Sequence, residues 1–349
     1  MSVATEGGGA AMRSRRAPRG TETGGAPRAP LTERLLARLP GSRTLRVAAW
    51  ALVPWVNLAA VSRLDPSLWA GGVPWGEVLN RVAASFAVVL SLWGVSRIDE
   101  ELYRLRPALA DVVAEAEPDV ARLFRGIDSA VVPLVLTAGV GLVLPLDEAL
   151  RGEAAAAAVQ GLTWLIIGVP LCTAVWVYVV LQRGLIRLGR GHVTLLGYRG
   201  DRTLGLRPVG RLAFTGFWLL FGAIGPLVLT GLTDVPVAAV GIGALAAALC
   251  LFFLSLRDIH RQMVSVKQRE LELALTLYRQ ALDRVRGEPT LEVLQQQSGL
   301  LGAAENLEKR AERILEWPFD EATLARVLTI ASSAAAGIIA RLVLVPTGI

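Results

Sequence analysis

Arginine side chains are the groups of this sequence whose number and spacing best fit a chemical role, and seven of them fall within residues 183–211. A guanidinium group binds phosphate oxygens through paired hydrogen bonds, so arginines beside a membrane can hold anionic lipid headgroups. Membrane topology alone also predicts positive charge at such a place, so both interpretations stay open. The arginines expected to contact anionic lipid are Arg183, Arg187, Arg190, Arg199 and Arg202.

Histidine and cysteine add little further chemistry. The two histidines, His192 and His260, have no carboxylate or cysteine at the spacing of a metal site. Cys172 and Cys250 each lie within an apolar run, where cysteine acts as a small core residue. We therefore expect no metal site, no cofactor and no disulfide.

Acidic groups are missing from the middle of the apolar runs, where ion-coupled carriers and membrane enzymes usually place them. Asp147 and Glu148 follow the third run. Gly241, Gly243 and Ala246 match a dinucleotide-binding spacing, but no strand precedes them. An enzyme that used the arginines as a phosphate clamp for lipid-linked substrates would lack a paired acid, base or nucleophile. We expect a protein that is not an enzyme.

The elements that must position these residues are long apolar runs. Of 349 residues, 53% are hydrophobic, the mean hydropathy is +0.49, and the runs are long enough to cross about 30 Å of hydrocarbon. The expected spans cover about 47–61, 78–95, 131–146, 162–181, 212–232 and 236–256, forming a six-helix transmembrane domain over 45–256. The predicted fold is an all-α polytopic membrane bundle of six or seven transmembrane helices.

The basic residues predict the orientation of this bundle. Nine arginines precede the first span, five lie in 97–128 and seven in 183–211, whereas the alternate loops hold only Arg63 and Arg151. Basic segments stay in the cytoplasm, so residues 1–40 are expected to form a disordered cytoplasmic tail, and 97–128 and 183–211 cytoplasmic loops. Within 98–112, apolar residues at alternating four and three spacing predict an amphipathic helix.

The arginines lie at the ends of apolar runs, which favours lipid contact and argues against nucleic acid binding. Only Lys267 and Lys309 are lysines, and alanine and glycine are abundant, which suggests a bacterial chain. The predicted location is the bacterial cell membrane.

Residues 257–316 have the pattern of a cytoplasmic antiparallel coiled-coil hairpin about 40 Å long, at 1.5 Å per residue. A turn is predicted at 287–290. The first predicted seam is Val264, Gln268, Leu271, Leu275, Tyr278, Leu282 and Val285. The second predicted seam is Leu300, Ala304, Leu307, Ala311 and Ile314.

A hairpin returns the chain to its starting point, so Trp317, Pro318 and Phe319 are expected at the inner membrane surface. Asp320 is predicted to cap the next helix. Residues 320–346 would then form either a seventh transmembrane helix or a helix lying in the interface.

Two classes of function fit this organisation. The first is a membrane anchor, adaptor or sensor whose hairpin forms a homo-oligomer or binds a cytoplasmic protein partner, with the lipid bilayer as its other partner. The alternative is a channel or uncoupled transporter for a solute. The polar residues available for such a pathway are Asn57, Thr137, Gln160, Thr163, Thr173 and Thr215.

Overall fold

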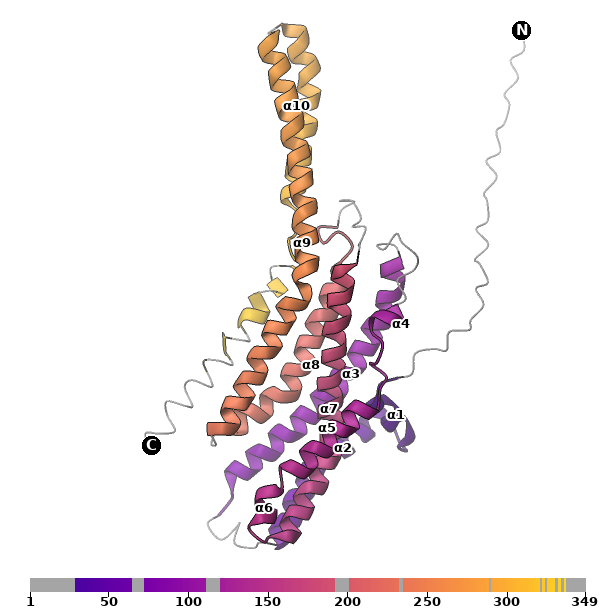
Figure 1. Ribbon diagram of the computed structural model, residues 1–349, viewed down its shortest axis with the longest axis vertical. Helices are drawn as coiled ribbons and strands as arrows, with labels where there is room; N and C mark the ends of the chain where they lie inside the picture. The colour runs from indigo at the N-terminus through magenta and orange to yellow at the C-terminus, as the bar shows by residue number, and fades with distance from the viewer. Residues whose placement is uncertain are drawn as a thin grey trace, which may run out of the picture.

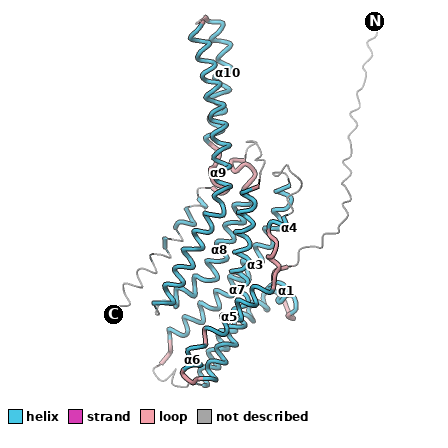
Figure 2. The backbone as a smooth tube through the Cα atoms, viewed as in Figure 1, coloured by secondary structure: helices cyan, strands magenta, loops and turns pink. Residues whose placement is uncertain are grey.

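The computed structural model describes residues 29–64, 72–110, 120–191, 201–231, 235–288 and 290–320, together with 322, 323, 325–329, 332, 333 and 336. All the named regular elements of this part of the chain are helices, which confirms the all-α prediction for it (Figures 1 and 2). They are α1 (Leu31–Arg38), α2 (Arg43–Leu64), α3 (Trp75–Ala110), α4 (Val120–Leu123), α5 (Val131–Val143), α6 (Leu146–Leu150), α7 (Ala154–Arg190), α8 (Arg207–Gly231), α9 (Val235–Gly287) and α10 (Leu291–Glu312).

Five of these helices are long and apolar enough to cross a membrane, which indicates a membrane-embedded protein. They are α2, α3, α7, α8 and α9. The third expected span is a shorter apolar helix, because α5 has only 13 residues. At 1.5 Å per residue it is about 20 Å long, less than the roughly 30 Å of hydrocarbon that a span must cross.

Helices α3, α7 and α8 pack closely because glycines leave room between them. A Cβ added to Gly94 of α3 would lie 2.6 Å from the Leu219 side chain of α8, and one on Gly222 of α8 would lie 3.0 Å from Leu90. Helix α7 contacts α2, α3, α5, α8 and α9, so it lies at the centre of the bundle (Figure 1). These contacts follow the rule that small residues let membrane helices approach closely.

Three helices continue past the ends predicted from hydropathy. Helix α3 includes the amphipathic segment expected as a separate helix, and its Ile98 and Leu105 are fully buried. Helix α7 runs on to Arg190, so the beginning of the expected loop, residues 183–190, is helical. Helix α9 passes residue 257 unbroken, since Leu256, Ile259 and Met263 extend its buried face. The hydropathy of the sequence falls at these places, but the helical spacing of its buried residues continues through them.

Helix α10 packs back along the distal part of α9, and together they form the α9–α10 hairpin (residues 264–312), which projects from one end of the bundle (Figure 1). The residues predicted for the seam of the second arm are all buried or partly buried, namely Leu300, Ala304, Leu307, Ala311 and Ile314.

The seam predicted for the first arm is wrong at three of its seven positions, because Gln268, Leu275 and Leu282 are exposed. Ala274 and Ala281 are buried in place of the two leucines. A four-three pattern through Leu271, Tyr278 and Val285 can be completed by either set of residues. The distance between packed helices depends on the side chains at the contact, so the alanines let the two helix axes approach more closely than the leucines would.

The chain after α10 returns to the base of the hairpin. The Leu315 amide donates to the carbonyl oxygen of Arg202 at 3.0 Å, and the Lys267 ammonium lies 3.1 Å from the Glu316 carboxylate. Trp317 stacks on His260 with ring centroids 4.3 Å apart, and Phe319 stacks on Phe252.

The predicted cap at Asp320 is confirmed, since its carboxylate accepts a hydrogen bond from the Thr323 amide at 2.9 Å. The helix expected beyond it lies largely outside the described residues, as do residues 1–28 of the tail 1–40. The end of that tail, expected to be disordered, forms helix α1, in which Leu31 and Leu36 are buried.

Candidate functional site

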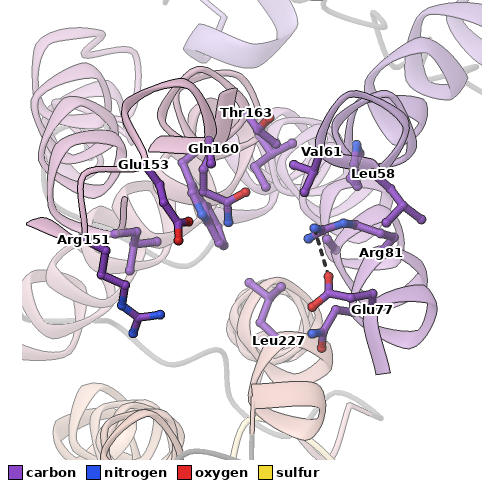
Figure 3. Close-up of a pocket in the computed structure, with 16 residues that line it drawn as sticks. Leu58, Val61, Glu77, Arg81, Arg151, Glu153, Gln160, Thr163 and Leu227 are labelled. Carbon is purple, nitrogen blue, oxygen red and sulfur yellow. Dashed lines mark ion pairs between the residues drawn. The ribbon is translucent and has the colours of Figure 1, made fainter. Parts of the chain in front are cut away.

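A cavity of about 730 Å³ lies among α2, α3 and α7, near α6 and so at the end of the bundle opposite the hairpin (Figures 1 and 3). Its volume is within the usual range of small-molecule sites. The polar lining residues are Glu77, Asn80, Arg81, Arg151, Glu153, Gln160 and Thr163. The remaining lining residues are Pro54, Leu58, Val61, Ala84, Leu144, Ala156, Trp164, Ile167 and Leu227.

Charges of both signs lie on both sides of this cavity. On α3, the Arg81 guanidinium lies 3.0 Å from the Glu77 carboxylate, and the two side chains are 17% and 38% exposed. Arg151 and Glu153 line the cavity from the segment that leads into α7. Figure 3 shows Glu153 and Gln160 extending from one side of the cavity while Arg81 reaches in from the other. Lined in this way, the cavity can bind polar and charged groups.

A hydrogen-bonded group joins α2 to α7 beside the cavity. The buried Asn57 amide donates to Thr163 Oγ1 at 2.7 Å and approaches Gln160 Oε1 at 3.4 Å. The structure thus brings together three of the six polar residues considered for a solute pathway. Of the other three, Thr173 and Thr215 each donate to a carbonyl of their own helix, and Thr137 packs against Gly168.

Arg81 is a site residue that sequence reasoning missed, because a single arginine near the end of a span is expected to reach toward the headgroups. The signal that could have found it is Glu77, four residues earlier on the same helix face. An arginine that is paired and largely buried in a membrane helix marks a functional position more often than an exposed one does.

Three of the five arginines expected to contact lipid lie on one exposed face of α7. Arg183, Arg187 and Arg190 are four and three residues apart, which places them on one side of the helix. Arg190 Nε lies 3.8 Å from the Asp258 carboxylate of α9. Arg202 is exposed in the turn before α8, and Arg199 lies outside the described residues.

The turn before α8 is organised by Asp201. Its carboxylate accepts hydrogen bonds from the Thr203 amide at 2.9 Å and the Gly205 amide at 3.0 Å. Partial burial alone would raise the pKa of Asp201, but these hydrogen bonds hold it below its ordinary value. Leu204 and Gly205 both have positive φ, of 54° and 86°, so the chain turns sharply there and returns Leu206 to the core.

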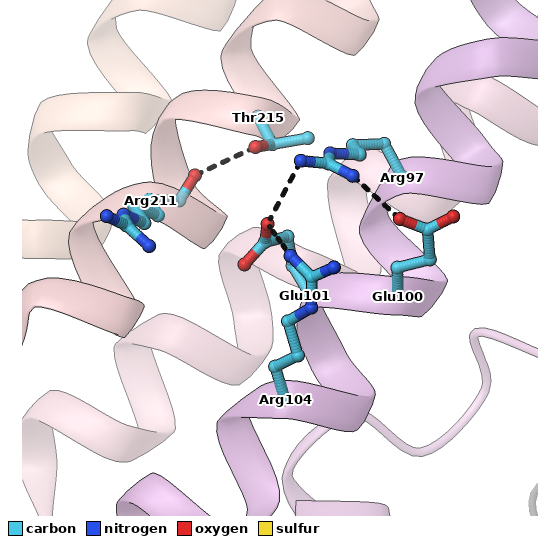
Figure 4. Close-up of polar contacts among 6 residues, drawn as sticks. All are labelled: Arg97, Glu100, Glu101, Arg104, Arg211 and Thr215. Carbon is cyan, nitrogen blue, oxygen red and sulfur yellow. Dashed lines mark hydrogen bonds and ion pairs between the residues drawn. The ribbon is translucent and has the colours of Figure 1, made fainter.

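A second charged group, on α3 close to α8, is a surface ladder of ion pairs (Figure 4). Arg97 lies 2.7 Å from Glu100 and 3.8 Å from Glu101, which is also 3.3 Å from Arg104. Pairs of opposite charge three and four residues apart on a partly exposed helix face stabilise the helix by about 0.3–0.5 kcal/mol each. We therefore assign this ladder to helix stability.

Within the part of the chain that the structure describes, no group of three or more histidine, cysteine and acidic residues could hold a metal ion. Of the two histidines, His192 lies outside the described residues. His260 Nδ1 donates to the Glu316 carbonyl oxygen at 2.7 Å, so it supports the base of the hairpin.

Comparison of the chain with protein family models, characterised proteins and solved structures found no match.

Proposed function

We propose that this chain is a multi-pass protein of the bacterial cell membrane, without enzymatic activity, that acts as an anchor, adaptor or sensor through its α9–α10 hairpin. The hairpin is an antiparallel coiled coil that serves self-association or binds a protein partner. Helix α9 supports this proposal because it is one continuous helix from the membrane-embedded bundle into the first arm. A displacement of either end of this helix is therefore transmitted to the other.

The orientation that we propose places the N-terminus, the hairpin and the arginine face of α7 in the cytoplasm. Helices α2 and α3 then cross outward and inward, α5 with α6 and α7 do the same, and α8 and α9 complete six crossings. For the segment 320–346, most of which lies outside the described residues, we propose a seventh crossing or, as the alternative, a helix lying in the interface. The support is the arginine distribution, which follows the positive-inside rule in every loop.

The observation that carries the proposal is the exposure of leucines along the hairpin. Alanines fill the seam, whereas Leu275 and Leu282 on α9 are 50% and 44% exposed and Leu291 and Leu294 on α10 are 74% and 47% exposed. Full burial of a leucine is worth about 1.5–3 kcal/mol relative to exposure. Leucines left in water on both arms favour contact with a further protein surface.

In-cell photo-crosslinking tests this proposal. A photoreactive residue at Arg279 lies between Leu275 and Leu282 on the same face of α9, and one at Gln280, about 100° further round the helix, serves as the control. We expect crosslinks from Arg279 that disappear in a Leu275→Gln, Leu282→Gln variant and persist in a Thr276→Gln, Asp283→Gln variant.

The product of this crosslinking identifies the mode of action. A recurring foreign protein would establish an adaptor or sensor, and crosslinks between two copies of the chain would establish a homo-oligomer. The same crosslinks from Arg279 and Gln280, or none from Arg279, would contradict the proposal.

A second function, passage of a solute as a channel or uncoupled transporter, is favoured by the cavity and by the Asn57, Gln160 and Thr163 group beside it. Purified protein in liposomes should then release a trapped solute faster than empty vesicles do. Release at the same rate as empty vesicles, over a panel of ions and small neutral solutes, would exclude it.

The arginine face adds a proposed lipid contact. Arg183, Arg187, Arg190, Arg199 and Arg202 would bind anionic headgroups at the inner leaflet. We expect an Arg183→Gln, Arg187→Gln variant to retain fewer anionic lipids than the native protein in native mass spectrometry. Equal retention in both proteins would assign these arginines to topology alone.

A further inference from the structure

We propose that the cavity among α2, α3 and α7 binds a zwitterion, a molecule that carries an acidic group and an ammonium group a few bonds apart. This inference does not depend on the proposed role of the hairpin, which lies at the opposite end of the bundle (Figure 1). A free zwitterionic solute and a zwitterionic lipid headgroup share the chemistry that the cavity would recognise.

The first support is the balance of charge in the lining. Glu77 and Glu153 carry two negative charges, and Arg81 and Arg151 carry two positive charges, so the charged lining residues sum to zero. A single anion in this cavity would be attracted by the arginines but repelled by the glutamates. A single cation would be attracted by the glutamates but repelled by the arginines. A ligand with both charges gains from both pairs.

The second support is the unused hydrogen-bonding capacity of Arg81. A guanidinium group has five N–H donors, and the ion pair with Glu77 is made by one of its terminal nitrogens, Nη2. The Nε atom is buried and has no hydrogen-bond partner among the described residues. Arg81 reaches into the cavity (Figure 3), so its remaining donors can take up an acidic group of a ligand in the paired geometry that guanidinium prefers.

The third support is the place of Glu153. It is the N-cap residue of α7, but its carboxylate makes no capping hydrogen bond with that helix. It lines the cavity instead, and Figure 3 shows it extending from the side opposite Arg81. The two residues thus provide an anion partner and a cation partner on opposite walls, and a zwitterion can bridge them.

Amides and a hydroxyl complete the polar lining. Asn80, Gln160 and Thr163 face the cavity, and the adjacent Asn57 is 3% exposed with an Oδ1 atom that has no partner among the described residues. Buried polar atoms without partners cost stability, so such an atom beside a cavity favours a ligand or water as its partner. The apolar wall, which includes Trp164 and Leu144, suits a short aliphatic part of the ligand.

A calorimetric titration of the purified full chain in maltoside detergent tests the proposal with four matched probes. Glycerophosphoethanolamine is a soluble zwitterion, glycerol phosphate and ethanolamine are its anionic and cationic halves, and dihexanoyl phosphatidylethanolamine below its micellar concentration is the lipid form. We expect at least one zwitterion to bind at least tenfold more tightly than either half. Equal or tighter binding of glycerol phosphate, or no saturable binding of either zwitterion, would overturn the proposal.

The two zwitterionic probes distinguish the source of the ligand. Equal affinities for the soluble and the lipid forms would identify a solute site, whereas binding of the lipid form alone would identify a headgroup site within the bilayer. Both results support the proposed chemistry.

Variants locate the binding in the cavity. Arg81→Gln should weaken binding of the zwitterion at least tenfold, and Arg104→Gln, on the same helix but in the exposed ladder, should leave it unchanged. Should Arg81→Gln not fold, as judged by gel filtration, the exposed Glu153→Gln replaces it with the same expected loss. Unchanged affinity in the folded cavity variant would overturn the assignment.

Discussion

The Tyr178 hydroxyl donates a hydrogen bond to the carbonyl oxygen of Ala248 at 2.6 Å, and both residues are buried. This bond joins α7, the central helix of the bundle, to α9, the helix that continues into the hairpin. It therefore fixes the arm of the hairpin to the helix that also lines the cavity.

Removal of this hydroxyl should weaken the bundle. Tyr178→Phe leaves the ring in place and removes the bond between α7 and α9, so we expect a loss of about 1 kcal/mol, since such bonds between membrane helices average about 0.6 kcal/mol and reach about 1.7. Tyr103→Phe, at a residue that is 76% exposed, is the matched control and should change nothing. Unfolding in a titration with a denaturing detergent measures both, and equal losses would show that the bond contributes no stability.

The contact between α8 and the segment after α10 should depend on the missing side chain of Gly210. A Cβ at this position would overlap the carbonyl oxygen of Pro318, so Gly210→Ala must displace the segment 317–319 from the base of the hairpin. Overpacking of this kind costs about 1–3 kcal/mol. Gly299→Ala in α10, where a Cβ would meet no atom within 4 Å, should be neutral or slightly stabilising. Thermal melting of the two variants checks the difference, and similar melting temperatures would contradict the close approach.

The alanine seam of the hairpin should be sensitive to side-chain size. Ala274 is 1% exposed, so Ala274→Leu should force the arms apart at a cost of about 1–3 kcal/mol. Leu275→Ala, at the neighbouring exposed position, should alter stability by less than about 0.5 kcal/mol. The rate of tryptic cleavage within residues 264–312 reports the opening of the arms. Faster cleavage in Leu275→Ala than in Ala274→Leu would favour the seam first expected from the sequence.

Two aspartates near the base of the hairpin should make stability depend on acid. Hydrogen bonds from Thr323 lower the pKa of Asp320, and those described above lower that of Asp201. Each aspartate therefore binds a proton more readily in the unfolded chain than in the folded one. The stability that the two ionised carboxylates contribute is fully present above the ordinary pKa of 3.8 and is lost as pH falls through their lowered folded pKa values. The melting temperature of the native chain, measured between pH 3 and 7, should fall as the pH is lowered. The fall should be less steep in the Asp201→Asn variant.

Glu33 of α1 should act in the opposite direction. Burial raises the pKa of Glu33, and the Arg43 guanidinium 3.0 Å away offsets this only in part. A raised folded pKa contributes stability that is fully present below the ordinary value of 4.5 and is lost as pH rises through the folded value. Glu33→Gln should therefore raise the melting temperature at neutral pH relative to the native chain, with no gain at pH 3. A gain of the same size at both pH values would contradict this sign.

The sequence by itself predicted the features that depend on local chemistry. Apolar runs identify helices for a membrane because the transfer free energy is a sum over neighbouring residues, and the four-three spacing of Ala304, Leu307 and Ala311 identifies the buried face of α10. The cap at Asp320 was predictable for the same reason, since it requires one side chain and the amide three residues later.

Only the tertiary structure decided which distant residues meet. Arg81 and Glu153 line one cavity although 71 positions separate them, and Asn57 of α2 donates a hydrogen bond to Thr163 of α7. In the first arm of the hairpin, periodicity allowed either Leu275 or Ala274 in the seam, and the approach of α10 selected alanine. Such pairings depend on how helices pack, which is set by shape and distance between whole surfaces, so no local pattern in the sequence contains them.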